Sequence, residues 1–229
     1  MKKILFVLTS HDRKGNTGQP TGYYLPEAAH PWAVLHTNGF EVDFASPKGG
    51  TPPMEGADSI DPACRKFLEN QNVSLKLKNT LTPDQVKPTD YSAILFVGGH
   101  GTMWDFPDNH SLASIAKSIY EDGGVVSALC HGPAALVNLK LSNGEYLIKG
   151  KQIAAFTDDE ERAVNLDHVV PFMLESTLRQ RGANHKHAPN WQANVVVDGR
   201  LVTGQNPASA EGIGLEISRL LKNSTSPLH

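Results

Sequence analysis

A cysteine at the junction of two apolar runs is the strongest chemical signal in the sequence. Cys130 follows Val125–Leu129, which is typical of a buried strand, and precedes 131–139, which is typical of a helix. Its neighbours Ala128 and Gly132 are small, as a tight strand-to-helix turn that presents a nucleophile requires. We expect the first free N–H groups of the following helix to lower the pKa of the thiol. The pattern predicts a reactive thiolate at the top of a parallel sheet, and therefore an enzyme.

A glycine-rich turn follows another predicted strand, at 93–97. It contains Gly98, Gly99 and His100, with a further glycine after the histidine. Glycines let the backbone approach a ligand closely and can direct N–H groups at an oxyanion. The spacing matches neither the dinucleotide nor the phosphate-loop pattern. A tight turn without a ligand is the alternative, but beside the cysteine we favour an oxyanion-stabilising and substrate-binding role.

Glu27 is a candidate acid–base residue because it lies in an apolar segment after the first predicted strand. Burial of a carboxyl group favours its protonated form. A protonated Glu27 could donate a hydrogen bond to the thiolate and then exchange protons with a substrate. The alternative is an ordinary glutamate at a helix start, stabilised by the helix dipole. This segment by itself favours that alternative.

His131 is next to the cysteine and needs an acidic partner to act as a base. A run of four acidic residues after a predicted strand supplies the candidates: Asp158, Asp159, Glu160 and Glu161. Carboxylates are also common in the first turn of a helix, so most of the four are expected to serve there. The residues themselves leave open which one orients His131.

The remaining cysteines and histidines predict no further site. Cys64 lies at an apparent helix start and is expected to pack in the core, and two cysteines cannot form a disulfide framework. His185 and His187 could lie on one face of a strand, but the chain has no zinc-binding spacing. We therefore predict surface histidines and no metal site.

The order of the apolar runs predicts an α/β fold. Near-continuous apolar runs predict parallel strands buried on both faces, at 4–8, Glu41–Ala45, 93–97, Val125–Leu129 and 152–156. Helices are expected at 31–38, 109–121, 131–139, 168–181 and 209–221, and a hairpin at 193–197 and 201–203. This alternation indicates a doubly wound, mostly parallel sheet with helices on both faces. We expect one domain over 1–229, with an irregular insertion at about 46–90 near the active site.

Composition excludes several classes of protein. The 229 residues have a formal net charge of −3, which does not suggest nucleic acid or an anionic membrane as a partner. The chain has no apolar run of the roughly 20 residues that span a bilayer. The first apolar run ends at polar residues 11–14 without a small-residue cleavage site. We interpret that run as a buried strand and expect a cytoplasmic protein.

Three segments together resemble the ThiJ/PfpI superfamily, which is related to the class I glutamine amidotransferases. They are 24–31, which contains Glu27, the turn at 98–101, and 128–134 around Cys130. The chain is most similar to the branch of glutathione-independent glyoxalases (glyoxalase III), also studied as heat-inducible chaperones and deglycases. Segments 42–50 and 201–209 extend the resemblance over essentially the whole chain.

The resemblance implies a flavodoxin-like sandwich that forms a homodimer and uses no cofactor. It implies that Cys130 is the nucleophile, His131 its histidine and Glu27 the glutamate that contacts the thiol. Glu161 matches the acidic member, although Glu160 stands where the family often has glycine. The resemblance also implies that the N–H groups of Gly99 and His131 face the oxyanion.

The activity implied is conversion of methylglyoxal to lactate, and of glyoxal to glycolate, through a hemithioacetal on Cys130. Deglycation of protein or nucleotide adducts is an alternative that uses the same thiol. A stress holdase chaperone and another cysteine-dependent hydrolase are further alternatives. Oxidation of the thiol as a redox sensor also stays open.

Overall fold

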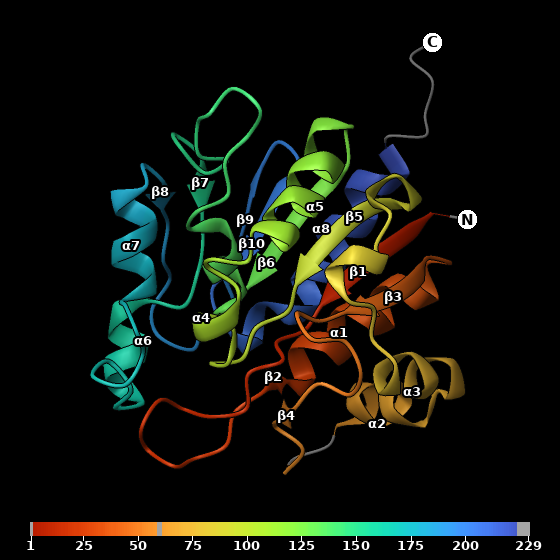
Figure 1. The fold of residues 1–229 in the computed structure, drawn as a ribbon, viewed down its shortest axis with the longest axis horizontal. Coiled ribbons are helices and arrows are strands. Elements are labelled where there is room, and N and C mark those ends of the chain that lie inside the picture. Colours follow the sequence, from red (N-terminus) through yellow and green to blue (C-terminus); the bar gives the residue numbers. More distant parts are fainter. Residues whose placement is uncertain (1, 59–60, 224–229) are drawn as a thin grey trace.

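The computed structural model describes residues 2–58 and 61–223 and contains a central six-stranded sheet (Figure 1). Its strand order is β3-β1-β5-β6-β10-β9, and all neighbours are parallel except β10 and β9. The strands are β1 (Lys3–Val7), β3 (Glu41–Ala45), β5 (Tyr91–Phe96), β6 (Val125–Leu129), β9 (Val195–Asp198) and β10 (Leu201–Gly204). The predicted doubly wound, flavodoxin-like α/β fold is confirmed.

Helices cover both faces of this sheet. Helix α5 (His110–Glu121) packs on β5 and β6, and α8 (Ala210–Asn223) packs on β6 and β10 from the other side (Figure 1). Helix α1 (Leu25–Thr37) lies against α8. Because the sheet is covered on both sides, its central strands must be apolar along their whole length.

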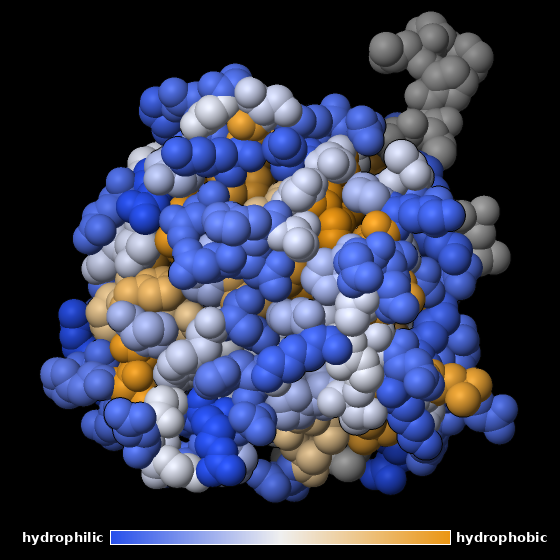
Figure 2. Space-filling model, viewed as in Figure 1, coloured by the Kyte–Doolittle hydropathy of each residue, from blue (hydrophilic) through white to orange (hydrophobic). Residues whose placement is uncertain are grey.

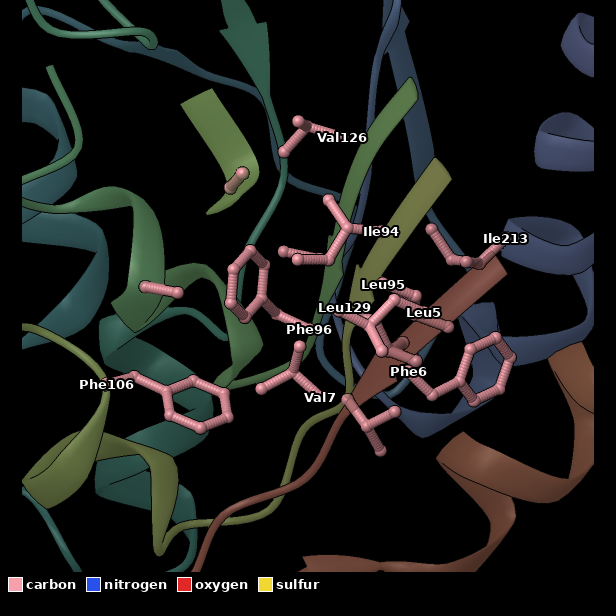
Figure 3. Packing of buried hydrophobic residues seen from close by; sticks show 14 of the residues in the cluster. Leu5, Phe6, Val7, Ile94, Leu95, Phe96, Phe106, Val126, Leu129 and Ile213 are labelled. Atoms are coloured by element: carbon pink, nitrogen blue, oxygen red, sulfur yellow. The ribbon is translucent and has the colours of Figure 1, made fainter. Parts of the chain in front are cut away.

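The core lies between the sheet and these helices. Leu5, Ile94 and Leu129, from three neighbouring strands, are fully buried and belong to the apolar cluster drawn in Figure 3. At the carboxyl end of β5, the rings of Phe96 and Phe106 meet edge to face, 5.6 Å apart. This packing makes the strand ends a rigid base for the turns that follow them.

The short elements complete the chain. They are β2 (Tyr23–Tyr24), β4 (Met54–Glu55), α2 (Pro62–Glu69), α3 (Gln71–Lys78), η1 (Pro83–Gln85), η2 (Pro88–Asp90), α4 (Thr102–Asp105), η3 (Gly132–Leu136), β7 (Gln152–Ile153), α6 (Asp158–Ala163), α7 (Leu174–Gln180), β8 (Asn184–His185) and η4 (Pro207–Ser209). Within 46–90, α2 packs on α1, and α3 packs on α2 and β3. The predicted hairpin and closing helix are confirmed as β9–β10 and α8.

The strand expected at 152–156 is wrong as a member of the central sheet. Only its first two residues form a strand, β7, which pairs in parallel with β8. Beyond it, side chains take the backbone donors: Ala154 N donates to Thr203 Oγ1 at 2.8 Å and Ala155 N to His185 Nε2 at 3.0 Å. These bonds replace the ladder that a strand needs.

Three predicted helices have different bounds. Helix α1 begins at Leu25, with Pro26 in its first turn, so Pro31 lies inside the helix and does not start it. The helix expected at 131–139 is the short 3₁₀ helix η3, and that expected at 168–181 is α7 alone. Pro31 was expected to start the helix because proline is favourable in a first turn. Pro26 occupies that position in α1, and Pro31 lies within the helix.

Among the described residues, no helix is both long enough and apolar enough to cross a bilayer. The face of the molecule in Figure 2 is largely hydrophilic, and its apolar residues lie in separate small groups.

Candidate active site

Cys130 occupies a strained turn directly after β6. Its φ of +59° lies in the left-handed region, which costs a residue with a side chain about 1–3 kcal/mol. Both of its backbone groups are anchored: its N–H donates to Gly204 O at 2.9 Å, and its carbonyl accepts from Phe156 N at 2.9 Å. A Cβ on Gly132 would lie 2.1 Å from Phe96 O. Gly132, two positions after the cysteine, must therefore be glycine because the backbone of Phe96 approaches it closely.

His131 connects the thiol to Glu161. Its Nδ1 lies 3.4 Å from Cys130 Sγ, and its Nε2 lies 2.6 Å from Glu161 Oε2. All three side chains are buried. The arrangement has the nucleophile, base and orienting acid of a catalytic triad.

The other three acids of the run face elsewhere. Asp158 accepts hydrogen bonds from the N–H and hydroxyl of Ser176 at the start of α7, and exposed Asp159 pairs with Arg162. Glu160 is fully buried, and its Oε2 accepts the N–H of Thr157 at 3.1 Å, which caps α6. Of the four candidates, only Glu161 contacts His131 in the described structure.

His100 is brought to the same carboxylate. Its Nε2 lies 2.7 Å from Glu161 Oε1, and its ring lies 4.0 Å from that of His131, centroid to centroid. Burial, with the neighbouring His131, lowers the pKa of His100 to about 4, so this side chain is neutral at pH 7. A neutral imidazole with its proton on Nε2 donates to Glu161. The His100 side chain therefore supports the triad acid, which the glycine-rich motif did not reveal.

The two histidines fix the charge of Glu161. Burial by itself would raise the pKa of this carboxyl, but His131 and His100 outweigh burial and lower the pKa well below its usual range. Because the carboxylate accepts the Nε2–H of His131, the Nδ1 lone pair is left to face the thiol. This tautomer is the one that can accept a proton from Cys130.

Glu27 faces the thiol from α1 and is fully buried. Burial raises its pKa to about 8, against the opposing effect of the Cys130 thiol and the Gly98 N–H beside it. Among the described residues, neither carboxyl oxygen has a hydrogen-bond partner of ordinary geometry. A buried carboxyl without partners is costly unless it is neutral, and with a pKa of about 8 the Glu27 side chain is mostly protonated at pH 7.

Gly98 makes room for this carboxyl. A Cβ at position 98 would lie 2.0 Å from Glu27 Oε2 and 2.8 Å from Cys130 Cβ. Gly98→Ala is therefore expected to displace both side chains and lower kcat about 100-fold, because a shift of about 1 Å can have that effect. The measurement is kcat beside that of Gly144→Ala, a position where a Cβ meets nothing within 4 Å and only the positive φ of +83° introduces strain, far from the thiol. A normal kcat in a folded Gly98→Ala variant would contradict this view of the site.

The expectation of a lowered thiol pKa is wrong. Burial, and then the negative charge that Glu27 can carry, raise the pKa of Cys130 well above its usual range, although the His131 N–H opposes them. The short η3 helix follows the cysteine in place of a long helix, and burial outweighs its N–H groups. With a raised pKa the thiol is protonated at neutral pH, and His131 Nδ1, 3.4 Å away, is placed to accept its proton.

Gly99 and His131 both line the cavity that holds the thiol. Gly99 lines the cavity above Cys130, and the N–H of His131 points at the sulfur. Within the described chain, neither amide donates a hydrogen bond to another backbone or side-chain group. Unused backbone donors at a nucleophile are suited to an oxyanion. The oxyanion role of Gly99 stays a prediction. The N–H of Gly98 faces the carboxyl group of Glu27 instead.

A cavity of about 630 Å³ opens above the cysteine. Cys130, His131, His100 and Glu27 all line it, and residues 54–58 of the irregular segment form part of its wall. The site lies beyond the carboxyl ends of β5 and β6, where ligands of doubly wound folds bind.

His185 is buried, so its prediction as a surface histidine is wrong, whereas His187 is exposed. The imidazole of His185 fits between Ala155 and Glu175, and its Nδ1 lies 3.4 Å from Glu175 Oε1. One potential ligand atom from each of Glu175, His185 and His187 lies within 4.8 Å of the other two, as a metal site would require. Arg179 already binds Glu175 Oε1, however, at 2.8 Å.

The fold and the site define a class of protein. Residues 21–220 match the model of the DJ-1/PfpI family, and the chain belongs to this family.

Two curated relatives resemble the chain over nearly its full length. It is 35% identical to Glyoxalase 3 of Candida albicans, covering 92% of this chain and 94% of that protein. It is 36% identical to the glutathione-independent glyoxalase HSP31 of Saccharomyces cerevisiae, covering 97% and 99%.

Solved structures agree. The Francisella tularensis Rapid Encystment Protein 24 KDa superposes with a TM-score of 0.93 at 40% identity, covering 96% of this chain and 99% of the other. Glyoxalase III of Candida albicans superposes with a TM-score of 0.88 at 33% identity, covering 96% and 97%.

Proposed function

We propose that this protein is a glutathione-independent glyoxalase that converts methylglyoxal to lactate. The observation that carries the proposal is that two proton-transfer groups, His131 and Glu27, face one thiol from different elements. A thiol with only a base suits hydrolysis. A second, separately placed acid suits movement of a proton between adjacent carbons. The names of the relatives agree with this activity.

The first step is addition of Cys130 to the aldehyde carbon. His131 Nδ1 takes the thiol proton, and Glu161 stabilises the imidazolium that forms. Sulfur bonds to carbon, and the aldehyde oxygen becomes an oxyanion beside the amides of Gly99 and His131. Donation of a proton to this oxygen gives a neutral hemithioacetal.

The second step moves a proton between carbons. A base, Glu27 or His131, takes the proton from the sulfur-bearing carbon, and the neighbouring carbonyl oxygen gains a proton, which gives an enediol. Protonation of the neighbouring carbon, with loss of the proton from the hydroxyl on the sulfur-bearing carbon, then gives a thioester of lactate on Cys130. The pKa of about 8 for Glu27 is near the pH of reaction, which suits a group that both accepts and donates.

Hydrolysis completes the cycle. Water adds to the thioester, the carbon–sulfur bond breaks, and lactate and the thiol are released. The overall change is methylglyoxal plus water to lactate, without net oxidation or reduction. No external thiol is required, because Cys130 forms the hemithioacetal that a soluble thiol would otherwise form.

The test is the balance of methylglyoxal consumed and lactate formed by the wild type after all small thiols have been removed. The proposal requires one lactate for each methylglyoxal, at a rate that added glutathione does not raise. Loss of methylglyoxal without lactate would mean scavenging by side chains and would refute a glyoxalase.

Glu27→Gln is expected to change how stability depends on pH. The folded pKa of about 8 lies above the ordinary 4.5, so the wild type loses stability as pH rises from about 4.5 towards 8. The loss is about 1.4 kcal/mol for each pH unit within this window. Glutamine carries no such charge and is free of this loss.

The measurement is urea unfolding of wild type and Glu27→Gln between pH 5 and 8. We expect the free energy of unfolding of the variant, relative to wild type, to rise by a few kcal/mol across this range. A constant difference would mean that Glu27 ionises in the folded protein as easily as in water.

A further inference from the structure

The cavity carries three exposed apolar side chains at its mouth. Met54, Val164 and Trp191 are exposed by 40%, 37% and 47%, and all three line the cavity. The other two exposed large hydrophobic side chains of the described residues, Leu75 and Leu215, lie outside it. Exposed apolar side chains gathered at a site mark binding, whereas scattered ones do not.

An aromatic wall joins this mouth to the triad. The ring of Phe156 lies 4.3 Å from that of His131 and 5.9 Å from that of Trp191, between centroids. A group that extends from the sulfur of Cys130 along this wall therefore reaches Trp191. The apolar side chains of the mouth and the reacting atom belong to one continuous cavity.

The position of Trp191 is imposed at a cost. Its φ of +67° is in the left-handed region, where a bulky residue is strained. Its N–H donates to Glu160 Oε1 at 2.9 Å, and the same buried oxygen accepts from Asn206 Nδ2 at 2.9 Å and Gln205 Nε2 at 3.1 Å. Glu160 thus anchors the backbone of Trp191. A strained backbone that buried polar side chains hold in place beside a cavity indicates a functional role for Trp191.

The size and charge of the cavity restrict what it takes. Its volume of about 630 Å³ lies within the roughly 300–1,000 Å³ of pockets that bury drug-sized ligands, so methylglyoxal fills only a small part. Lys14 at the mouth pairs with Glu55 at 2.7 Å, which neutralises the cation. The part of the cavity that methylglyoxal does not fill therefore offers apolar contact, and the lysine that lines the cavity is already paired.

We propose that Met54, Val164 and Trp191 form a subsite for an uncharged apolar or aromatic substituent on the substrate's carbonyl group. This inference rests on the proposed function and names its substrate class: 2-oxoaldehydes with a bulky apolar substituent, of which phenylglyoxal is the simplest aromatic probe. Trp191 is the residue that sets this preference.

The experiment compares kcat/KM for phenylglyoxal and methylglyoxal in wild type, Trp191→Gly and Leu215→Ala. Glycine removes the ring and tolerates the positive φ, while Leu215→Ala truncates an exposed apolar side chain outside the cavity. We expect the wild type to prefer phenylglyoxal by at least about tenfold, as a filled apolar pocket does. Trp191→Gly should lose most of this preference, with kcat/KM for phenylglyoxal falling at least about tenfold more than kcat/KM for methylglyoxal, and Leu215→Ala should match wild type.

Equal kcat/KM for the two aldehydes in the wild type would overturn the subsite and leave the glyoxalase proposal standing. An unchanged preference in Trp191→Gly would also overturn it. If Trp191→Gly altered sedimentation in place of selectivity, the mouth would be an interface between copies, which contradicts the subsite.

A binding readout separates the two proposals. In Cys130→Ala, calorimetric titration with acetophenone, which lacks the aldehyde, is expected to show binding at least about tenfold weaker when Trp191 is also replaced by glycine. Equal affinity in both proteins would overturn the subsite. Binding with this difference, but no turnover of either aldehyde by wild type, would support the subsite and refute the glyoxalase.

Discussion

Cys130→Ala is expected to lower kcat/KM for methylglyoxal by at least about 10⁴-fold, because removal of a nucleophile removes the covalent route entirely. The residual environment, with His131, Glu27 and two amides, has no group that can bond to the aldehyde carbon. The fold should survive, because the change removes one sulfur atom from a side chain 5% exposed at the cavity. Circular dichroism and a melting curve check that survival.

Cys64→Ala is the matched control. This cysteine is also buried, but it packs in α2 beside Asp61 and does not line the cavity. We expect some loss of stability and near-normal turnover. If Cys130→Ala kept a tenth or more of the wild-type activity, the thiol would not be the nucleophile.

Glu161→Gln is the second change with a large expected effect, a loss of about 10²–10⁴-fold in kcat. The carboxylate accepts from both histidines, at 2.6 and 2.7 Å, and an amide can accept with only one of its two atoms. In either orientation the amide lacks the negative charge that stabilises the His131 imidazolium.

The comparison for this variant is Asp159→Asn, a loss of charge in the same turn of α6 whose side chain is exposed and pairs with Arg162. It should leave kcat within about twofold. An equal, small effect of both substitutions would show that Glu161 does not orient His131 and is only one of the acidic residues in the first turn of α6.

The nucleophile turn could be predicted because its requirements are local. Cys130 is recognisable from an apolar run before it and small residues around it, and Gly132 is small because a backbone carbonyl lies 2.1 Å from where its Cβ would be. The central strands were likewise predictable, because strands covered on both faces must be apolar throughout. Glu161 was selected among four acids only through the family resemblance.

What the sequence could not reveal depends on contacts between distant segments. His100 and Glu161 are 61 positions apart, and nothing near either residue predicts their hydrogen bond. The strand predicted at 152–156 fails because side chains from other segments take its N–H groups. The pKa of Cys130 was misjudged because burial, which raises it, is a property of the folded chain.

The residue type at position 160 was a clue to its role that only the structure explains. The family resemblance implied glycine at this position, and only the structure shows the Glu160 carboxyl group accepting hydrogen bonds from the Trp191 N–H and from the side chains of Gln205 and Asn206. A buried carboxylate that accepts several hydrogen bonds is well satisfied and rigid.

The most direct test of a covalent mechanism is the mass of the Cys130 peptide from wild-type protein quenched in acid during turnover of methylglyoxal. We expect a mass increase of one methylglyoxal on Cys130, absent from Cys64, that disappears once the substrate is exhausted and lactate has formed. Lactate formed at the full rate while Cys130 stays unmodified throughout would contradict it, and so would an adduct that persists after turnover ends.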